Sequence, residues 1–316
     1  MLVPIVVLVA SLALLVKSAD YFTEGAEKAA VALGVSPFIV GATVASIGTS
    51  IPELFTSLFS IMNGTPEAIT IVMGDVIGSN IANIALVLGG TVTIMRIAQG
   101  VNAEMRFRWD LIRVDIPLLV AATAYLWLAS ADGLFTMGEG FVSILLYLVY
   151  FKYTLRTHRK GTKKKDGGSM RNGIIKMAIG GAGVLIGAHY CVGAIIGVAG
   201  VFAIPTTVIA ASAVAIGTSL PELAVSAQAA LKKKYELAIG NITGSCIFNA
   251  LVVTGLPALF TPLTVSGVMM DIGLPFLLAA LAMFVVVSID KKVGHYEGYG
   301  LMALYVLFIA KLFGLF

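Results

Sequence analysis

One motif occurs twice in this chain, and each copy places a glutamate inside a long apolar stretch. Residues 42–54 read ATVASIGTSIPEL, and residues 211–223 read ASAVAIGTSLPEL. Each copy is followed by a second matching patch, GDVIGSNIAN at 74–83 and GNITGSCIFN at 240–249. A charged side chain at the centre of a bilayer costs roughly 2.5–3.5 kcal/mol even on a lenient insertion scale. The repetition of so costly an arrangement predicts that Glu53 and Glu222 belong to a functional site.

The composition predicts an integral membrane protein. Apolar residues make up 59% of the chain and charged residues 12%, whereas soluble domains contain about 45–50% and about 25%. The first apolar segment has no cleavage site after it and is interpreted as a retained span. Both cysteines, Cys191 and Cys246, lie in apolar segments, so no disulfide framework is indicated. A basic folded face is lacking, which excludes a nucleic-acid partner.

Apolar runs bounded by charged residues, Gly and Pro predict ten membrane spans. They lie near 2–23, 37–62, 67–94, 108–130, 138–156, 172–199, 204–230, 236–260, 266–289 and 297–314. The one long polar stretch is a basic linker at 157–170, which separates a first five-helix repeat (1–156) from a second (171–316). An odd number of spans per repeat requires the second repeat to insert upside down. The predicted fold is therefore an all-α integral membrane protein with ten transmembrane helices in two inverted five-helix repeats.

The loops between these spans alternate in charge. Lysines and arginines gather near residues 96–113, in the linker, at 232–234 and at 291–292, whereas the intervening loops are acidic or uncharged. The positive-inside rule then predicts a multi-pass protein of the cell membrane with cytoplasmic basic loops and both termini outside. The linker is interpreted as a solvated loop that fixes this topology. Binding of anionic lipid is the alternative.

The repeated motif gathers oxygen atoms. Pro52 removes a backbone donor from its helix, which frees carbonyl groups of the preceding turn. Hydroxyl and amide side chains recur at helical spacing around the two glutamates, and no His or Cys ligand set accompanies them. Such an all-oxygen set is typical of hard cations such as calcium and sodium, whereas soft metals need Cys or His. For Ser46, Ser57 and Ser226, helix packing is an equal alternative to ion ligation.

The two motifs GTSIPEL and GTSLPEL, with the patches GSNIAN and GSCIFN, resemble the repeats of the cation/calcium antiporter superfamily, and within it the prokaryotic sodium/calcium exchangers. The resemblance covers the whole chain. It implies that Glu53 and Glu222 are the central ligands of both calcium and sodium. It further implies hydroxyl or carbonyl oxygens from Thr49, Ser50, Thr218 and Ser219, backbone carbonyls from Ser46 and Ala215, and flanking sodium sites completed by Ser79, Asn83, Ser245 and Asn249.

The implied function is secondary active antiport of sodium for calcium, by alternating access at a midplane site. Such a protein is not an enzyme, has no cofactor, and needs only its ions and membrane lipid, with no obligate protein partner inferred. Proton-coupled calcium exchange is the first alternative, although that branch typically carries GNAxE in place of GTSxPE. A passive cation channel and an intramembrane metal-dependent enzyme are the alternatives from other classes. Asn249 stands where the potassium-dependent branch has aspartate, which argues against potassium transport.

Two further expectations concern charge and motion. With Glu53 and Glu222 as the fixed charges, three sodium ions would leave the loaded site at +1, which predicts electrogenic exchange. The resemblance implies that the first and sixth spans slide as a gate, and the sixth span is rich in small Gly residues. Asp20 and His189 occupy equivalent positions on these spans. They are interpreted as residues near the interface or paired with neighbours, with an access-path or proton-carrying role as the alternative.

Overall fold

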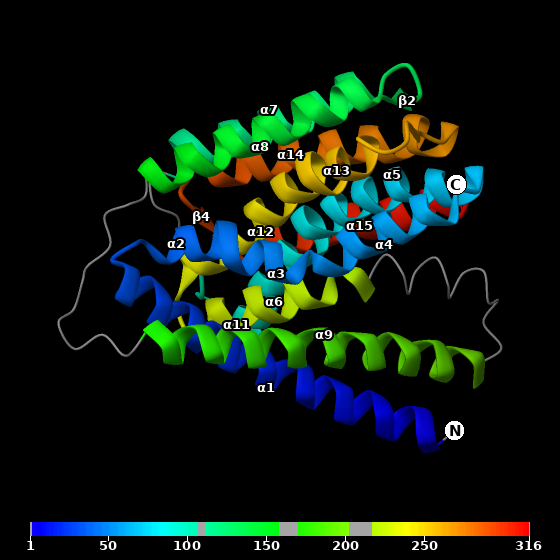
Figure 1. Ribbon diagram of the computed structural model, residues 1–316. Helices are drawn as coiled ribbons and strands as arrows, with labels where there is room; N and C mark the ends of the chain where they lie inside the picture. Colours follow the sequence, from blue (N-terminus) through cyan, green and yellow to red (C-terminus); the bar gives the residue numbers. More distant parts are fainter. Residues whose placement is uncertain (1, 101, 107–110, 158–169, 202–216, 316) are drawn as a thin grey trace.

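The computed structural model is almost entirely helical, which confirms the predicted all-α class (Figure 1). It describes residues 2–100, 102–106, 111–157, 170–201 and 217–315. The predicted ligand Ala215 and most of the linker lie outside these ranges.

Two long helices, α1 (Leu2–Leu33) and α9 (Met170–Val201), lie side by side along one edge of the bundle (Figure 1). Glycine permits this close approach, because a Cβ atom at Gly180 would lie 2.5 Å from the Phe22 backbone nitrogen. The first helix continues well beyond its predicted end at residue 23. The acidic residues that suggested this end are held by lysines, as in the 2.7 Å pair between Glu24 and Lys176, so the helix continues through them.

The first motif lies on a bent helix. Its parts are α2 (Pro37–Val40), the π-helical turn η1 (Gly41–Ala45), α3 (Ser46–Thr49) and α4 (Ile51–Asn63). The helix bends by 42° between Thr49 and Ile51. Pro52 accounts for the bend, because its ring lacks an N–H and clashes with the preceding turn. The equivalent helix of the second motif, α11 (Leu220–Leu231), likewise carries Pro221 in its first turn.

The second patches lie on two helices that each contain a π-helical turn. The first consists of α5 (Pro66–Ile81), η2 (Ala82–Val87) and α6 (Leu88–Gln99). The other consists of α12 (Tyr235–Phe248), η4 (Asn249–Val253) and α13 (Gly255–Ala258). Glycines bring α12 against η1, since a Cβ atom at Gly41 would lie 2.5 Å from the Leu237 carbonyl oxygen. The first motif therefore lies directly against the second half's patch.

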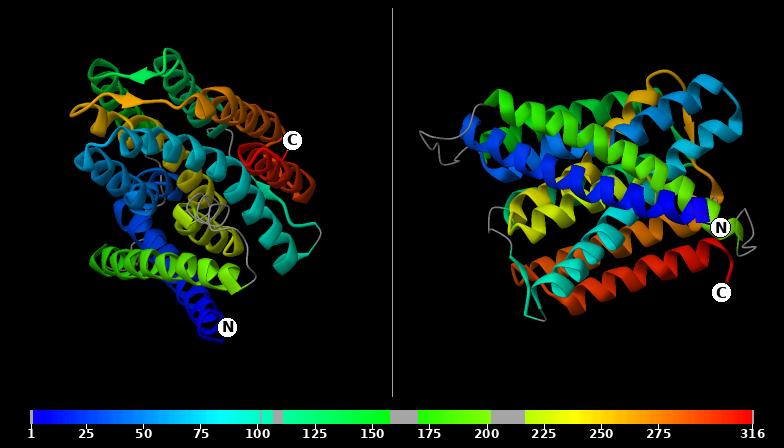
Figure 2. Two further views of the ribbon diagram at one scale, coloured as in Figure 1. Left: turned by 90° about the vertical axis from the view of Figure 1, so that its right-hand side faces the viewer. Right: turned by 90° about the horizontal axis from the view of Figure 1, so that it is seen from below.

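The remaining helices cover the side of the bundle away from α1 and α9 (Figure 2). They are η3 (Leu111–Asp115) with α7 (Ile116–Ala129), α8 (Met137–Thr157), η5 (Met269–Gly273) with α14 (Leu274–Ser288), and α15 (His295–Leu312). Two short antiparallel strand pairs join their loops. Strand β1 (Met105–Arg106) pairs with β4 (Lys292–Val293), and β2 (Leu134–Phe135) pairs with β3 (Leu263–Thr264). Each pair links the first half of the chain to the second.

The helices that meet the length and apolarity of a membrane span are fewer than the ten predicted. Within the described residues five do so: Val3–Leu33, Ala68–Gln99, Met170–Cys191, Tyr235–Ala258 and Met269–Ser288. The bent helix from Pro37 to Met62 makes a sixth. The other predicted spans correspond to α7, α8, α11 and α15, which are shorter in the described ranges or more polar. Several spans are thus present, and the count of ten stays a prediction.

Candidate cation site

The two motif glutamates lie in equivalent positions, one at the start of each of two helices. Glu53 is in the first turn of α4 and Glu222 in the first turn of α11. Both side chains are fully buried, and they are close enough for their negative charges to repel each other. The positive end of the helix dipole favours a carboxylate at this position. The other buried carboxylate disfavours the ionised form, because two negative charges repel each other. A cation between the two carboxylates would relieve this repulsion.

The glutamate of the second motif contacts one residue from each half of the chain. The Ser50 hydroxyl donates a hydrogen bond to Glu222 Oε1 at 3.0 Å, and the Ser245 hydroxyl lies 3.5 Å from the same oxygen. All three side chains are buried. The structure therefore brings together predicted ligands that lie more than 170 positions apart in the chain.

The threonine of each motif meets the serine of the opposite patch. Thr49 Oγ1 lies 3.4 Å from Ser245 Oγ, and Thr218 Oγ1 lies 3.3 Å from Ser79 Oγ. The two contacts are related by the sequence repeat. Four predicted ligands, two from each half, are thus placed in two matching pairs.

A backbone carbonyl oxygen also lies in this cluster. The Ser46 carbonyl accepts from the Ser50 backbone N–H at 3.0 Å and from the Ser245 hydroxyl at 3.5 Å. The Ser46 hydroxyl itself donates to the Thr43 carbonyl at 3.1 Å within the same helix. This contact favours the packing alternative for the Ser46 side chain and leaves its carbonyl as the predicted ligand.

The two asparagines Asn83 and Asn249 lie in the π-helical turns η2 and η4 and are fully buried. Within the described part of the chain, neither side-chain amide has a hydrogen-bond partner, and the same holds for both Glu53 carboxylate oxygens and the Ser219 hydroxyl. Buried polar atoms are normally satisfied, and π-helical turns often mark functional positions. The oxygens of this cluster suit a hard cation.

No three His, Cys, Asp or Glu side chains converge on one metal position within the described ranges. A cation bound here would therefore take most of its ligands from hydroxyl, amide and carbonyl oxygens. The carboxylates in the described ranges are thus spread over the cluster rather than gathered at one point.

The structure adds residues that the sequence reasoning did not select. Asp75 on α5 interacts with the side chain of Ser79 one turn away, and its charge repels that of Glu53. Asn241 donates from Nδ2 to the Ser226 hydroxyl at 3.0 Å, which supports the packing interpretation of Ser226. Both were visible in the sequence, because they hold equivalent positions in the two patches GDVIGSN and GNITGSC.

A further pair of equivalent positions is in mutual contact. Asn80 Nδ2 donates to the Cys246 carbonyl at 3.1 Å, and the Cys246 Sγ atom lies 3.9 Å from the Asn80 carbonyl oxygen. Residues at equivalent places in two repeats contact each other reciprocally when a two-fold axis passes between them. This contact lies between α5 and α12, beside the cation cluster.

The other polar positions of the first and sixth spans lie away from this cluster. The Asp20 carboxylate forms an ion pair of 2.7 Å with the Lys232 ammonium group, beyond the end of α11. Glu27 pairs similarly with Lys234. His189 is exposed on α9. The pairing of Asp20 confirms its interpretation as a residue matched with a neighbour.

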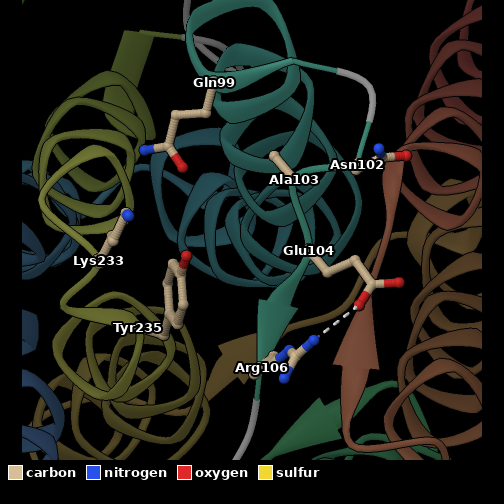
Figure 3. A pocket seen from close by; sticks show the side chains of 7 residues that line it. All are labelled: Gln99, Asn102, Ala103, Glu104, Arg106, Lys233 and Tyr235. Atoms are coloured by element: carbon tan, nitrogen blue, oxygen red, sulfur yellow. Dashed lines mark ion pairs between the residues drawn. The ribbon is translucent and has the colours of Figure 1, made fainter.

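A polar cavity of about 360 Å³ lies at the basic end of the bundle (Figure 3). It is formed by the end of α6, strand β1 and the turn before α12, and it contains none of the predicted site residues. The Glu104 carboxylate on its wall lies 2.6 Å from the Lys292 ammonium and 3.7 Å from Arg106. The hydrogen bond from Lys292 lowers the pKa of Glu104. This cavity is therefore separate from the buried glutamate cluster.

Residues 3–155 and 173–314 match the family model described as sodium/calcium exchanger protein. The chain belongs to the sodium/calcium exchanger family. A relative in Methanosarcina acetivorans, sodium/calcium exchanger MaX1, is 31% identical, and the match covers 97% of each chain. The inner membrane protein YrbG of Escherichia coli is 33% identical over 83% of this chain and 81% of its own. The family predicted from the repeated motifs is thus confirmed.

Solved structures of an exchanger agree with this fold. A structure of the sodium-calcium exchanger NCX_Mj superposes with a TM-score of 0.83 at 30% identity, over 98% of this chain and 99% of that one. The family is one of membrane exchangers, not enzymes. This exchanger-family chain is accordingly a multi-pass membrane protein.

Proposed function

We propose that this chain is a secondary active antiporter that exchanges sodium for calcium across the cell membrane. The names of MaX1 and NCX_Mj support this pair of ions, and so does the all-oxygen cluster. Calcium and sodium are the transported substrates, and they bind in alternation at the buried cluster. Access to the cluster alternates between the two sides of the membrane.

The observation that carries the proposal is the placement of Glu53 and Glu222. Two fully buried carboxylates, one from each repeated motif, are surrounded by hydroxyls, amides and a backbone carbonyl from both halves of the chain. Their combined charge of −2 matches one calcium ion. Two or more sodium ions can occupy the same oxygens because sodium is a hard ion of similar size. Binding of either substrate therefore competes with binding of the other.

We further propose the complete topology of ten spans in two inverted repeats, with both termini outside. The strand pairs support it, because β1 pairs with β4 and β2 with β3. An inverted arrangement places these loops together, with the basic loops at one membrane face and the acidic or uncharged loops at the other. The reciprocal contact of Asn80 and Cys246 supports a two-fold axis between the repeats.

The test is calcium flux in proteoliposomes with an imposed sodium gradient. We expect calcium uptake to follow an outward sodium gradient at constant pH, and Glu53→Gln and Glu222→Gln to abolish it while the protein remains folded. Asp290→Asn, which removes a carboxylate from an exposed loop, is the matched control and should transport at the wild-type rate. Near wild-type transport by either Gln variant would refute the assigned site.

A second arm separates sodium coupling from proton coupling. The same vesicles are prepared without sodium and given a pH gradient. Calcium flux driven by the pH gradient, with no response to sodium, would replace the proposal with proton/calcium exchange. Flux that needs neither gradient and follows calcium passively would indicate a channel.

A further inference from the structure

The two repeats differ at one charged position beside the cation cluster. Asp75 in the first patch stands where the second patch has Asn241. The ligands predicted on these patches are the same residue type in both copies: Ser79 matches Ser245, and Asn83 matches Asn249. The first half therefore carries a carboxylate that the second half lacks.

The contacts of Asn241 show what this position does when it is an amide. Its Nδ2 group donates to the Ser226 hydroxyl at 3.0 Å and lies 3.4 Å from the Glu222 backbone carbonyl. Both partners are acceptors in these contacts. A carboxylate at the same position cannot donate to either of them. In the first half these acceptors correspond to the Ser57 hydroxyl and the Glu53 carbonyl.

The first half indeed contains oxygens that lack a donor. The Asp75 side chain is half-buried, but its Oδ2 atom is buried and has no hydrogen-bond partner within the described ranges. The same is true of the Ser57 hydroxyl, which is fully buried, and of both Glu53 carboxylate oxygens. The charges of Asp75 and Glu53 repel each other. The helices that carry these residues, α4 and α5, pack against each other. Buried oxygens without donors at such a contact suit a cation.

We propose that Asp75, the Glu53 backbone carbonyl and the Ser57 hydroxyl form a sodium subsite between α4 and α5, so that the chain carries one more sodium ion per calcium than its Asp75→Asn variant. The inference rests on the proposed sodium/calcium exchange. A monovalent ion fits because this corner offers one carboxylate plus neutral oxygens, and no group of three acidic side chains converges on one metal position in the described chain. The amide of Asn241 occupies the equivalent corner of the second half with its own donor.

The subsite also changes the charge of the loaded carrier. With three carboxylates in the cluster, three sodium ions bring it to zero, whereas calcium alone leaves it at −1. With Asn at position 75 the calcium-loaded carrier is neutral instead. In the wild type the calcium-loaded carrier therefore moves net charge across the membrane, whereas in Asp75→Asn the carrier is neutral with calcium and also with two sodium ions.

The experiment measures the coupling ratio in proteoliposomes clamped at zero membrane potential. A hundredfold calcium gradient is opposed by increasing sodium gradients until net calcium flux stops. That balance needs a sodium gradient of about fivefold when three sodium ions move per calcium and about tenfold when two move. We expect Asp75→Asn to need a larger sodium gradient than the wild type, because it moves one sodium ion fewer per calcium. Asp290→Asn should balance at the wild-type gradient.

Two further results keep the test decisive. Ser57→Ala keeps the charge of Asp75 but removes one oxygen, so it should raise the half-saturating sodium concentration several-fold while changing that of calcium little. Should Asp75→Asn fail to fold, this variant alone decides, and equal sodium dependence in Ser57→Ala and wild type would overturn the subsite. An unchanged balance point in folded Asp75→Asn, or a change confined to its pH dependence, would also overturn it. Absence of sodium-dependent flux in the wild type would instead refute the proposed function.

Discussion

Substituting alanine for Gly180 tests how tightly α1 and α9 are packed. The added Cβ atom would lie 2.5 Å from the Phe22 backbone nitrogen and 2.8 Å from both the Phe22 Cα and the Ser18 carbonyl oxygen. Ordinary contact begins near 3.4 Å, so the two helices must separate by roughly 1 Å, and backbone atoms cannot rotate away as a side chain can. Overpacking of this kind costs about 1–3 kcal/mol.

The same helix offers a matched control at Gly193. A Cβ atom there meets nothing within 4 Å. Both substitutions gain about 1 kcal/mol of helix propensity. The difference between their free energies of unfolding therefore measures the clash alone. We expect Gly180→Ala to be less stable than Gly193→Ala by about 1–3 kcal/mol, a factor of about 5 to 150 in the unfolding equilibrium. If α1 and α9 slide during transport, calcium flux should also fall.

The assay is thermal unfolding in detergent, followed by calcium flux at a temperature where both variants remain folded. The melting temperature of Gly180→Ala should lie below that of Gly193→Ala by several degrees. Equal melting temperatures would show that the helices separate without cost and would refute the packing argument. The expected loss of stability with unchanged calcium flux would instead show that this contact does not move during exchange.

Three more outcomes are expected. A single cysteine at Ser169 should resist an impermeant thiol reagent in sealed, right-side-out vesicles, and one at Asp132 should react; the reverse would contradict the orientation. Ser50→Ala removes a hydrogen bond to a carboxylate, an interaction of about 1.5–3 kcal/mol, and should raise the half-saturating calcium concentration about tenfold or more; an unchanged value would remove Ser50 from the site. Lys292 lowers the pKa of Glu104 below its ordinary 4.5, and Glu104 raises that of Lys292 above 10.5. Their stabilisation is therefore present between these pH values, and it is lost as the pH falls through the lowered pKa or rises through the raised one. The stability difference between wild type and Glu104→Gln should disappear at both extremes, and a pH-independent difference would argue against the pair.

Much of the site could be predicted because the chain repeats itself. A glutamate that recurs in the same polar setting within apolar sequence has few explanations, and Glu53 and Glu222 indeed lie buried and near each other. The partners of Ser50 could not be predicted in the same way. The hydrogen bond to Glu222 depends on how two distant helices cross, and no local pattern specifies that crossing.

Positions at which the two repeats differ can also belong to the site. Asp75 belongs to a repeated patch, but it stands at a position where the two copies differ, so the repeat itself does not mark it. The end of the first helix was likewise not predictable from local sequence. Charged residues usually end a membrane span, so the first helix was expected to stop near residue 23. Its acidic side chains find lysines on α9 and after α11, and contacts between separate segments are not visible in local sequence.

The strand pairs have a consequence for how the chain is made. Met105 pairs with Val293, about 190 residues later, and Phe135 pairs with Leu263. At roughly 5–20 residues per second of synthesis, the first strand waits about 10–40 s for its partner to leave the ribosome. During that interval the first half sits in the membrane with its strand edges open and with a buried glutamate whose neighbours have not yet been made. Completion of this protein is therefore a late event, and factors that shield unfinished membrane segments have their longest opportunity to act on the first half.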